Sequence, residues 1–118
     1  MDGKQIFRVA ILGSPQAERW LLVQAFAETR KRACVYLATD PGFRQPDMYV
    51  IDPDNDLALA RWMALDPRGS TPAAFFRRVH SRAKSAVIVS RPLTSGAVVD
   101  SLDRLARRFF GKRVAATA

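Results

Sequence analysis

The chain has 118 residues, of which 48% are hydrophobic and 25% are charged, which is typical of one soluble globular domain. No apolar stretch approaches the roughly 20 residues of a membrane-spanning helix, the first residues lack the apolar core of a secretory signal, and the lone Cys34 excludes an internal disulfide. The formal net charge of +8 favours acidic partners or polyanions without naming one. We therefore expect a cytoplasmic protein with one domain over residues 1–113 and a frayed tail over residues 114–118.

The first half of the chain predicts three strands and two helices. The run IFRVAIL is short, rich in β-branched residues and followed by Gly-Ser-Pro, which predicts a buried strand over residues 6–12. Apolar side chains spaced by three and four residues then predict a helix over residues 16–29. The runs ACVYLA and DMYVID predict strands over residues 33–38 and 47–52, with a Pro-Gly turn in the loop between them. Early acidic residues and a later apolar face predict a helix over residues 55–66.

The next stretch, STPAAFFRRVHSRAKS, is ambiguous. A proline near its start could open a helix over residues 72–84, but PAAFF fits a short buried strand equally well. A strand would give the sheet five strands, and a helix would leave it with four. We favour five strands, and both alternatives stay open at this point.

The end of the chain predicts one more strand and one more helix. SAVIVS predicts a strand over residues 85–90, and SGAVVDSLDRLARRFF predicts an amphipathic helix over residues 95–110. The helix has an acid four residues before an arginine twice, at Asp100 and at Asp103. We expect both acids to form surface ion pairs along the helix, worth about 0.2–0.5 kcal/mol each.

Strands that alternate with helices predict an α/β fold with a parallel sheet covered on both faces. In such sheets, ligands and reacting groups gather at the carboxyl ends of the strands. The residues that we expect at those ends, and that form the candidate pocket, are Gly13, Ser14, Asp52, Ser90, Arg91 and Pro92.

These segments resemble the receiver domain of bacterial two-component response regulators over nearly the whole chain. In that family the third strand ends in the phosphate-accepting aspartate, and DMYVIDPDN is similar to that motif, which implies the phosphoacceptor position for Asp52. The family's fifth strand ends in lysine and a cis proline, and VIVSRPLTSGAVVDSLDRL is similar with Arg91 and Pro92. AILGSPQAERWLL is similar to the first strand and helix, including Arg19. The resemblance implies a flavodoxin-like, doubly wound parallel sheet of about five strands.

The chain departs from the family pattern where magnesium would bind. Gly13 and Ser14 stand where the family has two adjacent acids, and they offer one hydroxyl and no charge. Arg91 replaces the lysine with a broad planar fork. We therefore expect neither magnesium nor another metal or cofactor, and we predict a contact between Arg91 and Asp52 in place of the ion.

A third departure is the distance in sequence between Asp52 and Arg91, which is too short for an additional helix. With PAAFF as the fourth strand, the family's fourth helix is shortened or missing. That helix lies on the face that carries the signal to partners in this family. The shortening therefore changes the usual switch as well.

These features predict a phosphorylation-independent protein-interaction module in bacterial signalling, not an enzyme. By resemblance its partner is a protein of a signalling pathway, such as a histidine kinase or an output protein, and a homodimer is a further expectation by analogy. The first alternative is a conventional phosphoacceptor that uses Asp52. The second is a small basic nucleic-acid-binding protein that uses the aromatic and basic run FFRRVHSRAK, which we consider weaker because such phenylalanines are usually core.

The run DPDND has aspartates at alternate positions, as a calcium-binding loop does. Such a loop needs a glycine next and a glutamate at its twelfth place, where this chain has Leu57 and Met63. We expect instead that one of Asp54, Asn55 or Asp56 caps the helix that follows.

Overall fold

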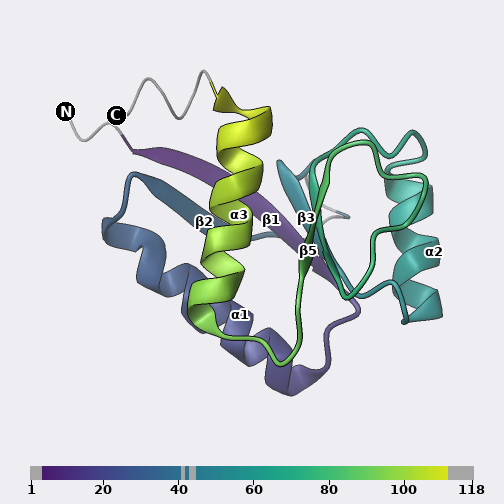
Figure 1. The fold of residues 1–118 in the computed structure, drawn as a ribbon, viewed down its shortest axis with the longest axis horizontal. Coiled ribbons are helices and arrows are strands. Elements are labelled where there is room, and N and C mark those ends of the chain that lie inside the picture. The colour runs from purple at the N-terminus through teal and green to yellow at the C-terminus, as the bar shows by residue number, and fades with distance from the viewer. Residues whose placement is uncertain (1–3, 41, 43–44, 112–118) are drawn as a thin grey trace.

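The structure is a computed structural model that describes residues 4–40, 42 and 45–111. Five parallel strands form one sheet in the order β2-β1-β3-β4-β5, which confirms the predicted fold class (Figure 1). The strands are β1 (Gln5–Leu12), β2 (Cys34–Ala38), β3 (Met48–Ile51), β4 (Ala73–Phe76) and β5 (Ala86–Val89). The helices are α1 (Gln16–Glu28), α2 (Asp56–Leu65) and α3 (Ser95–Phe109), with a short 3-10 helix η1 (Thr29–Lys31) after α1.

The order of the strands places the middle of β1 between two partners. Val9 aligns with Ala38 of β2 on one side and with Met48 of β3 on the other. The chain moves from β1 to one edge of the sheet, returns, and then continues through β3 to the other edge. The carboxyl ends of β1 and β3 therefore flank the point where ligands usually bind in such sheets.

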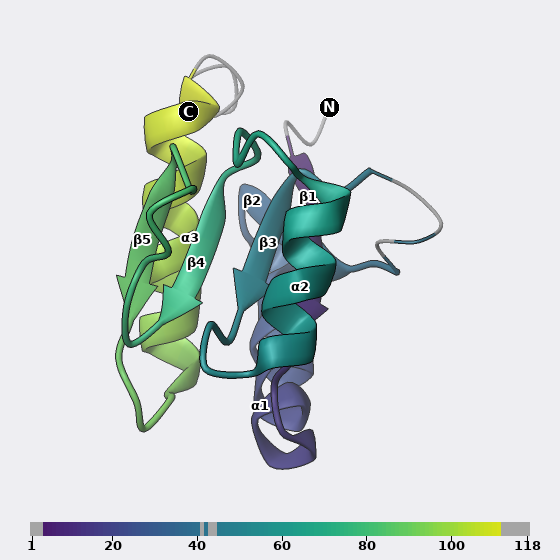
Figure 2. The same cartoon turned by 90° about the vertical axis from the view of Figure 1, so that its right-hand side faces the viewer.

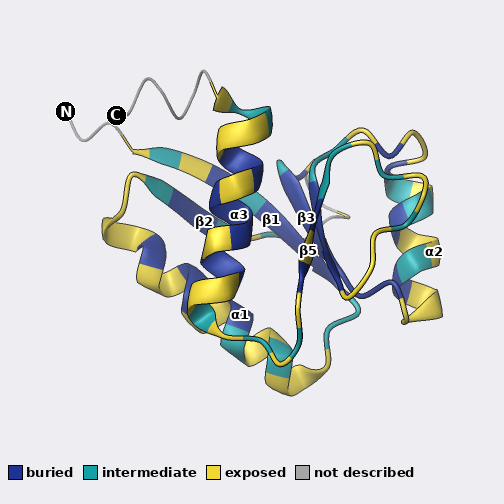
Figure 3. Cartoon of the chain, in the orientation of Figure 1, coloured by how far each residue is buried: buried dark blue, intermediate teal, exposed yellow. Residues whose placement is uncertain are grey.

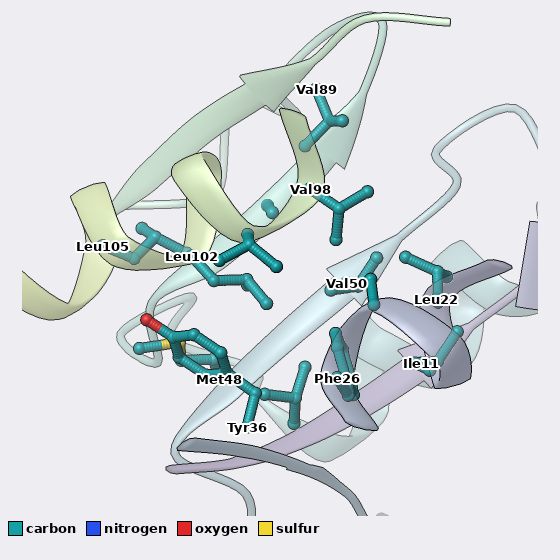
Figure 4. Close-up of a cluster of buried hydrophobic side chains, with 14 of the residues drawn as sticks. Ile11, Leu22, Phe26, Tyr36, Met48, Val50, Val89, Val98, Leu102 and Leu105 are labelled. Carbon is teal, nitrogen blue, oxygen red and sulfur yellow. The ribbon is translucent and has the colours of Figure 1, made fainter. Parts of the chain in front are cut away.

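One face of the sheet is covered by two helices, α1 and α3. Side chains from both helices and from all five strands meet there in the larger of two buried clusters, which includes Leu22 and Phe26 of α1 and Leu102 and Leu105 of α3 (Figure 4). Tyr36 also belongs to this cluster. Figure 3 shows α3 with buried residues toward the sheet and exposed residues on its outer side.

Among the described helices, α2 covers the opposite face (Figure 2). Its smaller buried cluster centres on Trp62, which is fully buried and meets the ring of Phe75 edge to face at 5.4 Å between centroids. His80, from the connection between β4 and β5, contacts the same indole. This connection therefore helps α2 to close the face.

Two connections between parallel strands contain no helix in the part of the chain described. Residues 39–47 join β2 to β3, and residues 77–85 join β4 to β5, whereas most parallel connections contain a helix. The ambiguous stretch is therefore a strand followed by a loop, and the expected loss of the fourth helix is confirmed. On the α2 face, Ile6 and Ile88 stay 49% and 47% exposed, because none of the other described helices covers the strands beside α2.

Neither of the two ion pairs expected along the last helix is found among the described residues: Asp100 has no ion pair with Arg104, and Asp103 has other partners. Asp103 is buried, not on the surface, and accepts hydrogen bonds from Tyr36 Oη at 2.5 Å and Arg32 Nη2 at 2.6 Å. It therefore ties α3 to the far edge of the sheet and does not pair with Arg107.

The predicted tail over residues 114–118 lies outside the described residues. No described helix has the length and apolarity that crossing a membrane would require.

Candidate functional site

The site residues predicted from sequence stand at the carboxyl ends of three strands. Asp52 follows β3, Gly13 and Ser14 follow β1, and Arg91 follows β5. Asp52 is only 8% exposed, and its backbone N–H donates to the carbonyl of Leu12 at 3.1 Å. The β1–β3 ladder thus continues to the aspartate and fixes where its side chain begins.

The predicted contact between Arg91 and Asp52 is present. Arg91 Nη2 donates to Asp52 Oδ2 at 2.9 Å, and the guanidinium also lies over the ring of Phe76, 4.8 Å from its centroid. The peptide bond between Arg91 and Pro92 is cis, as the resemblance implied. Pro92 is exposed, and Ser90 is exposed as well without a described side-chain hydrogen bond to the site.

A second carboxylate, which sequence reasoning missed, holds the same guanidinium. Arg91 Nε donates to Glu18 Oε2 at 2.8 Å and Arg91 Nη2 donates to Glu18 Oε1 at 2.9 Å, a bidentate pair. Hydrogen bonding to Glu18 raises the pKa of Arg91 above its ordinary value, and the bond to Asp52 raises it further against the opposing effect of burial. The guanidinium therefore stays charged and joins α1 to the end of β5.

The remaining oxygen of Asp52 is engaged too. Asp52 Oδ1 accepts the backbone N–H of Asp54 at 3.0 Å, and the Asp54 carboxylate pairs with Arg78 at 2.8 Å and with Arg77 at 3.4 Å. Arg77 directly follows β4 and has a positive φ of 71°, a conformation in which its N–H donates to the carbonyl of Val89.

We call this set the ion-pair cluster: Glu18, Asp52, Asp54, Arg77, Arg78 and Arg91. Its three carboxylates and three guanidiniums balance in formal charge. The phenylalanines before Arg77 are fully buried core, so stacking of bases on these rings, as the nucleic-acid alternative requires, is contradicted.

The turn after β1 has a structural reason for its glycine. Gly13 has a φ of 85°, and a Cβ on it would lie 2.6 Å from the Cβ of Ala58 in α2. An acidic side chain there would push α2 away from the sheet.

Asn55 caps α2 by accepting the N–H of Ala58 at 3.0 Å, which confirms one of the three capping candidates. Ser14 Oγ is buried and has no hydrogen-bond partner in the described structure.

Beside the ion-pair cluster, α1 presents an exposed apolar face. Trp20 is 66% exposed and Val23 is 41% exposed, and both line a shallow hollow of about 830 Å³ together with Ala17. A contiguous exposed apolar patch rimmed by polar residues is the pattern typical of an interaction surface. Glu18 of the ion-pair cluster belongs to the same helix.

The donor set at the strand ends is poor in metal ligands. No group of three His, Cys, Asp or Glu side chains that could hold a metal ion occurs in the described part of the chain. The carboxylates of Glu18 and Asp52 approach each other only through the guanidinium that both of them bind.

Comparison with known proteins supports the fold. No family model and no curated protein matches this chain. Among solved structures, the chain is similar to the signal receiver domain of a signal transduction histidine kinase from Syntrophus aciditrophicus, with a TM-score of 0.52 and 16% sequence identity. The match covers 84% of this chain and 89% of that one. A likeness at this identity shows the receiver-like fold alone.

Proposed function

We propose that this chain is a receiver-like protein-interaction module of bacterial signal transduction that works without phosphorylation and is not an enzyme. The observation that carries the proposal is the position of Arg91, whose guanidinium is bound by Asp52 and by Glu18 at once. The receiver-like fold supports the pathway, and the chemistry of the ion-pair cluster supports the altered mechanism.

Phosphoryl transfer to an aspartate brings several negative charges together. In receiver domains a divalent cation with carboxylate ligands offsets them, and hard cations of this kind take oxygen ligands. Here a guanidinium supplies the positive charge next to Asp52, and Gly13 and Ser14 supply no carboxylate. We infer that Arg91 replaces the magnesium ion and keeps the pocket in one charge state.

The same arrangement disfavours nucleophilic attack by the Asp52 carboxylate on a phosphoryl donor. Asp52 Oδ2 is hydrogen-bonded to Arg91 and Oδ1 is hydrogen-bonded to the N–H of Asp54, so both oxygens already have donors. A carboxylate stabilised in this way is a weaker nucleophile, because its charge is dispersed over strong hydrogen bonds. Freeing it would require breaking a bidentate pair as well, since Arg91 is held by Glu18.

The exposed face of α1 is the surface that we assign to the protein partner. Trp20 and Val23 would form the apolar centre of a contact, with Arg19 as a charged neighbour on the rim. This pattern fits a partner that presents an apolar helix with acidic flanks, such as a part of a histidine kinase or of an output protein. Substitution of Trp20 by Ala should weaken binding to a kinase encoded beside this gene.

Treatment with acetyl phosphate and magnesium tests the proposal directly. We expect intact-mass spectrometry to show no added phosphoryl group on the wild-type chain, with a conventional receiver domain treated in parallel as the positive control. An adduct on the wild type that disappears in Asp52→Asn would reject the proposal in favour of a conventional phosphoacceptor.

A gain-of-function variant sharpens the same test. Ser14→Asp with Arg91→Lys restores one acid and the compact ammonium while leaving Gly13 in place, where a side chain does not fit. We expect magnesium to quench or shift the fluorescence of this variant and not of the wild type. Asp52→Asn in the same background should remove the response. Tight magnesium binding by the wild type would contradict the role given to Arg91.

A further inference from the structure

A second hollow lies beside the ion-pair cluster, between α1, α2 and the ends of β1 and β2. Its volume is about 390 Å³, which is within the range of small-ligand sites. Its lining residues are Ile11, Arg19, Ala38, Thr39, Asp40 and Arg61. It is therefore mixed in character, with an apolar floor and two guanidiniums on its walls.

The charges in this hollow do not balance. Arg61 approaches Asp40 at 3.8 Å, and both side chains are more than half exposed, so this pair is weak. Asp40 Oδ1 also accepts the N–H of Gly42 at 2.9 Å. Arg19 has no carboxylate partner among the described residues. The hollow thus differs from the ion-pair cluster, where every guanidinium has a carboxylate.

The place of the hollow in the fold makes it suitable for a ligand. The described residues of the β2–β3 connection form no helix, and the exposed Arg61 side chain of α2 lies beside Asp40 of that connection. The hollow also lies at the carboxyl ends of parallel strands, next to the point where the strand order reverses. Arg19 comes from α1 on one face of the sheet, and Arg61 comes from α2 on the other.

We propose that this hollow binds a small anionic ligand that carries a phosphate or pyrophosphate group. Guanidiniums hold phosphate oxygens through paired hydrogen bonds, and the two arginines would approach such a group from opposite walls. The Thr39 hydroxyl could donate a further hydrogen bond, and Ile11 with Ala38 would contact an apolar part of the ligand. The proposal does not depend on the function proposed above.

Titration with pyrophosphate at moderate ionic strength tests this site. We expect saturable binding by calorimetry and quenching of the fluorescence of Trp20, the neighbour of Arg19. The double variant Arg19→Gln with Arg61→Gln should lose affinity by about tenfold or more, the equivalent of about 1.4 kcal/mol. The control, Arg104→Gln with Arg107→Gln, removes the same charge from the exposed side of α3 and should change affinity by less than about twofold.

A second measurement needs no variant. Amide chemical shifts of the wild type should move at Thr39 and Arg61 on addition of pyrophosphate and should stay in place along α3. The absence of saturable binding, or an equal loss of affinity in both double variants, would overturn the site. Binding of single-stranded oligonucleotide that depends on Arg19 and Arg61, without binding of pyrophosphate, would overturn it as well, because the ligand would then be a nucleic acid.

Discussion

The two faces of the sheet are covered to very different extents. The face under α1 and α3 has the larger buried cluster and two helices. On this face, Asp103 of α3 accepts hydrogen bonds from Tyr36 and Arg32 and so fixes α3 to the sheet. In the part of the chain that the structure describes, the α2 face has one helix and one central tryptophan, and the β4–β5 loop packs against that tryptophan through His80. The charged groups of the candidate sites lie at the carboxyl ends of the strands and come from both faces, since Glu18 and Arg19 belong to α1 and Arg61 belongs to α2. The faces thus differ in how they are stabilised, whereas the candidate sites draw on both.

The strongest test of this comparison is Trp62→Ala. Loss of a fully buried indole should lower the free energy of unfolding by about 3–5 kcal/mol, measured by urea denaturation. Because no second described helix supports α2 on its face, hydrogen exchange in the variant should accelerate in α2 much more than in α3. Leu57→Ala, on the exposed side of the same helix, serves as the control and should be nearly neutral. Equal acceleration in both helices would show that the faces do not differ in this way.

The next largest effect is expected at Gly69, where the connection before β4 supports the loop over the α2 face. Gly69 has a φ of 61°, and a Cβ there would lie 2.1 Å from the carbonyl oxygen of Arg82. Gly69→Ala should destabilise the protein by about 3 kcal/mol, from backbone strain and displacement of the loop. Thermal melting checks the loss. A melting point equal to that of the wild type would mean that the loop does not contribute to closing this face.

On the opposite face, Tyr36→Phe removes the hydroxyl that binds Asp103, and we expect a cost of about 2 kcal/mol near neutral pH. Burial, followed by the hydrogen bond to Asp103, raises the pKa of Tyr36 above its ordinary value of 10.0. The folded state therefore holds its proton more tightly than the unfolded state, so stability is full below pH 10 and falls as the pH rises further.

Tyr36→Phe should flatten this alkaline loss when unfolding is measured at increasing pH. Some slope should remain, because burial also raises the pKa of Tyr49. If the variant and the wild type lose stability in parallel above pH 10, Tyr36 is not the responsible group.

The smallest effect is expected from Ile88→Thr in β5. Ile88 faces the α2 side of the sheet and is about half exposed, so the change should stay within about 0.5 kcal/mol. Its neighbour Val87 faces α3 and is buried, and Val87→Thr should cost about 1–3 kcal/mol because a hydroxyl enters the core. Urea denaturation of both variants compares the two faces within one strand, and equal losses would contradict the difference.

Local patterns predicted most of the fold. The apolar runs placed four strands and left β4 ambiguous between a strand and a helix, and the short spacing between Asp52 and Arg91 favoured the strand and the missing helix. The contact between Arg91 and Asp52 also followed from the resemblance and from charge. These features depend on residues close in sequence or on a known motif.

Other parts of the site depend on contacts that no local pattern encodes. Glu18 binds Arg91 across 73 residues of sequence. An acid in the first turn of a helix is already expected from the helix dipole, so no local pattern assigned Glu18 to the site. Asp103 had an arginine at the favourable spacing on its own helix, but the buried hydroxyl of Tyr36 and the charge of Arg32 compete successfully for it. Tertiary geometry decided both cases.

The aromatic contact between Phe7 and Phe110 links the first strand to the residue after the last helix, with ring centroids 5.2 Å apart. During synthesis on the ribosome, the interior strand β1 emerges before the other four strands, and α3 emerges after all five. The apolar side of the growing sheet that packs against α3 must therefore wait until α3 is made before it is shielded. A chain shortened before α3 would expose this surface and should aggregate, whereas the loops on the other side could be lengthened with little harm.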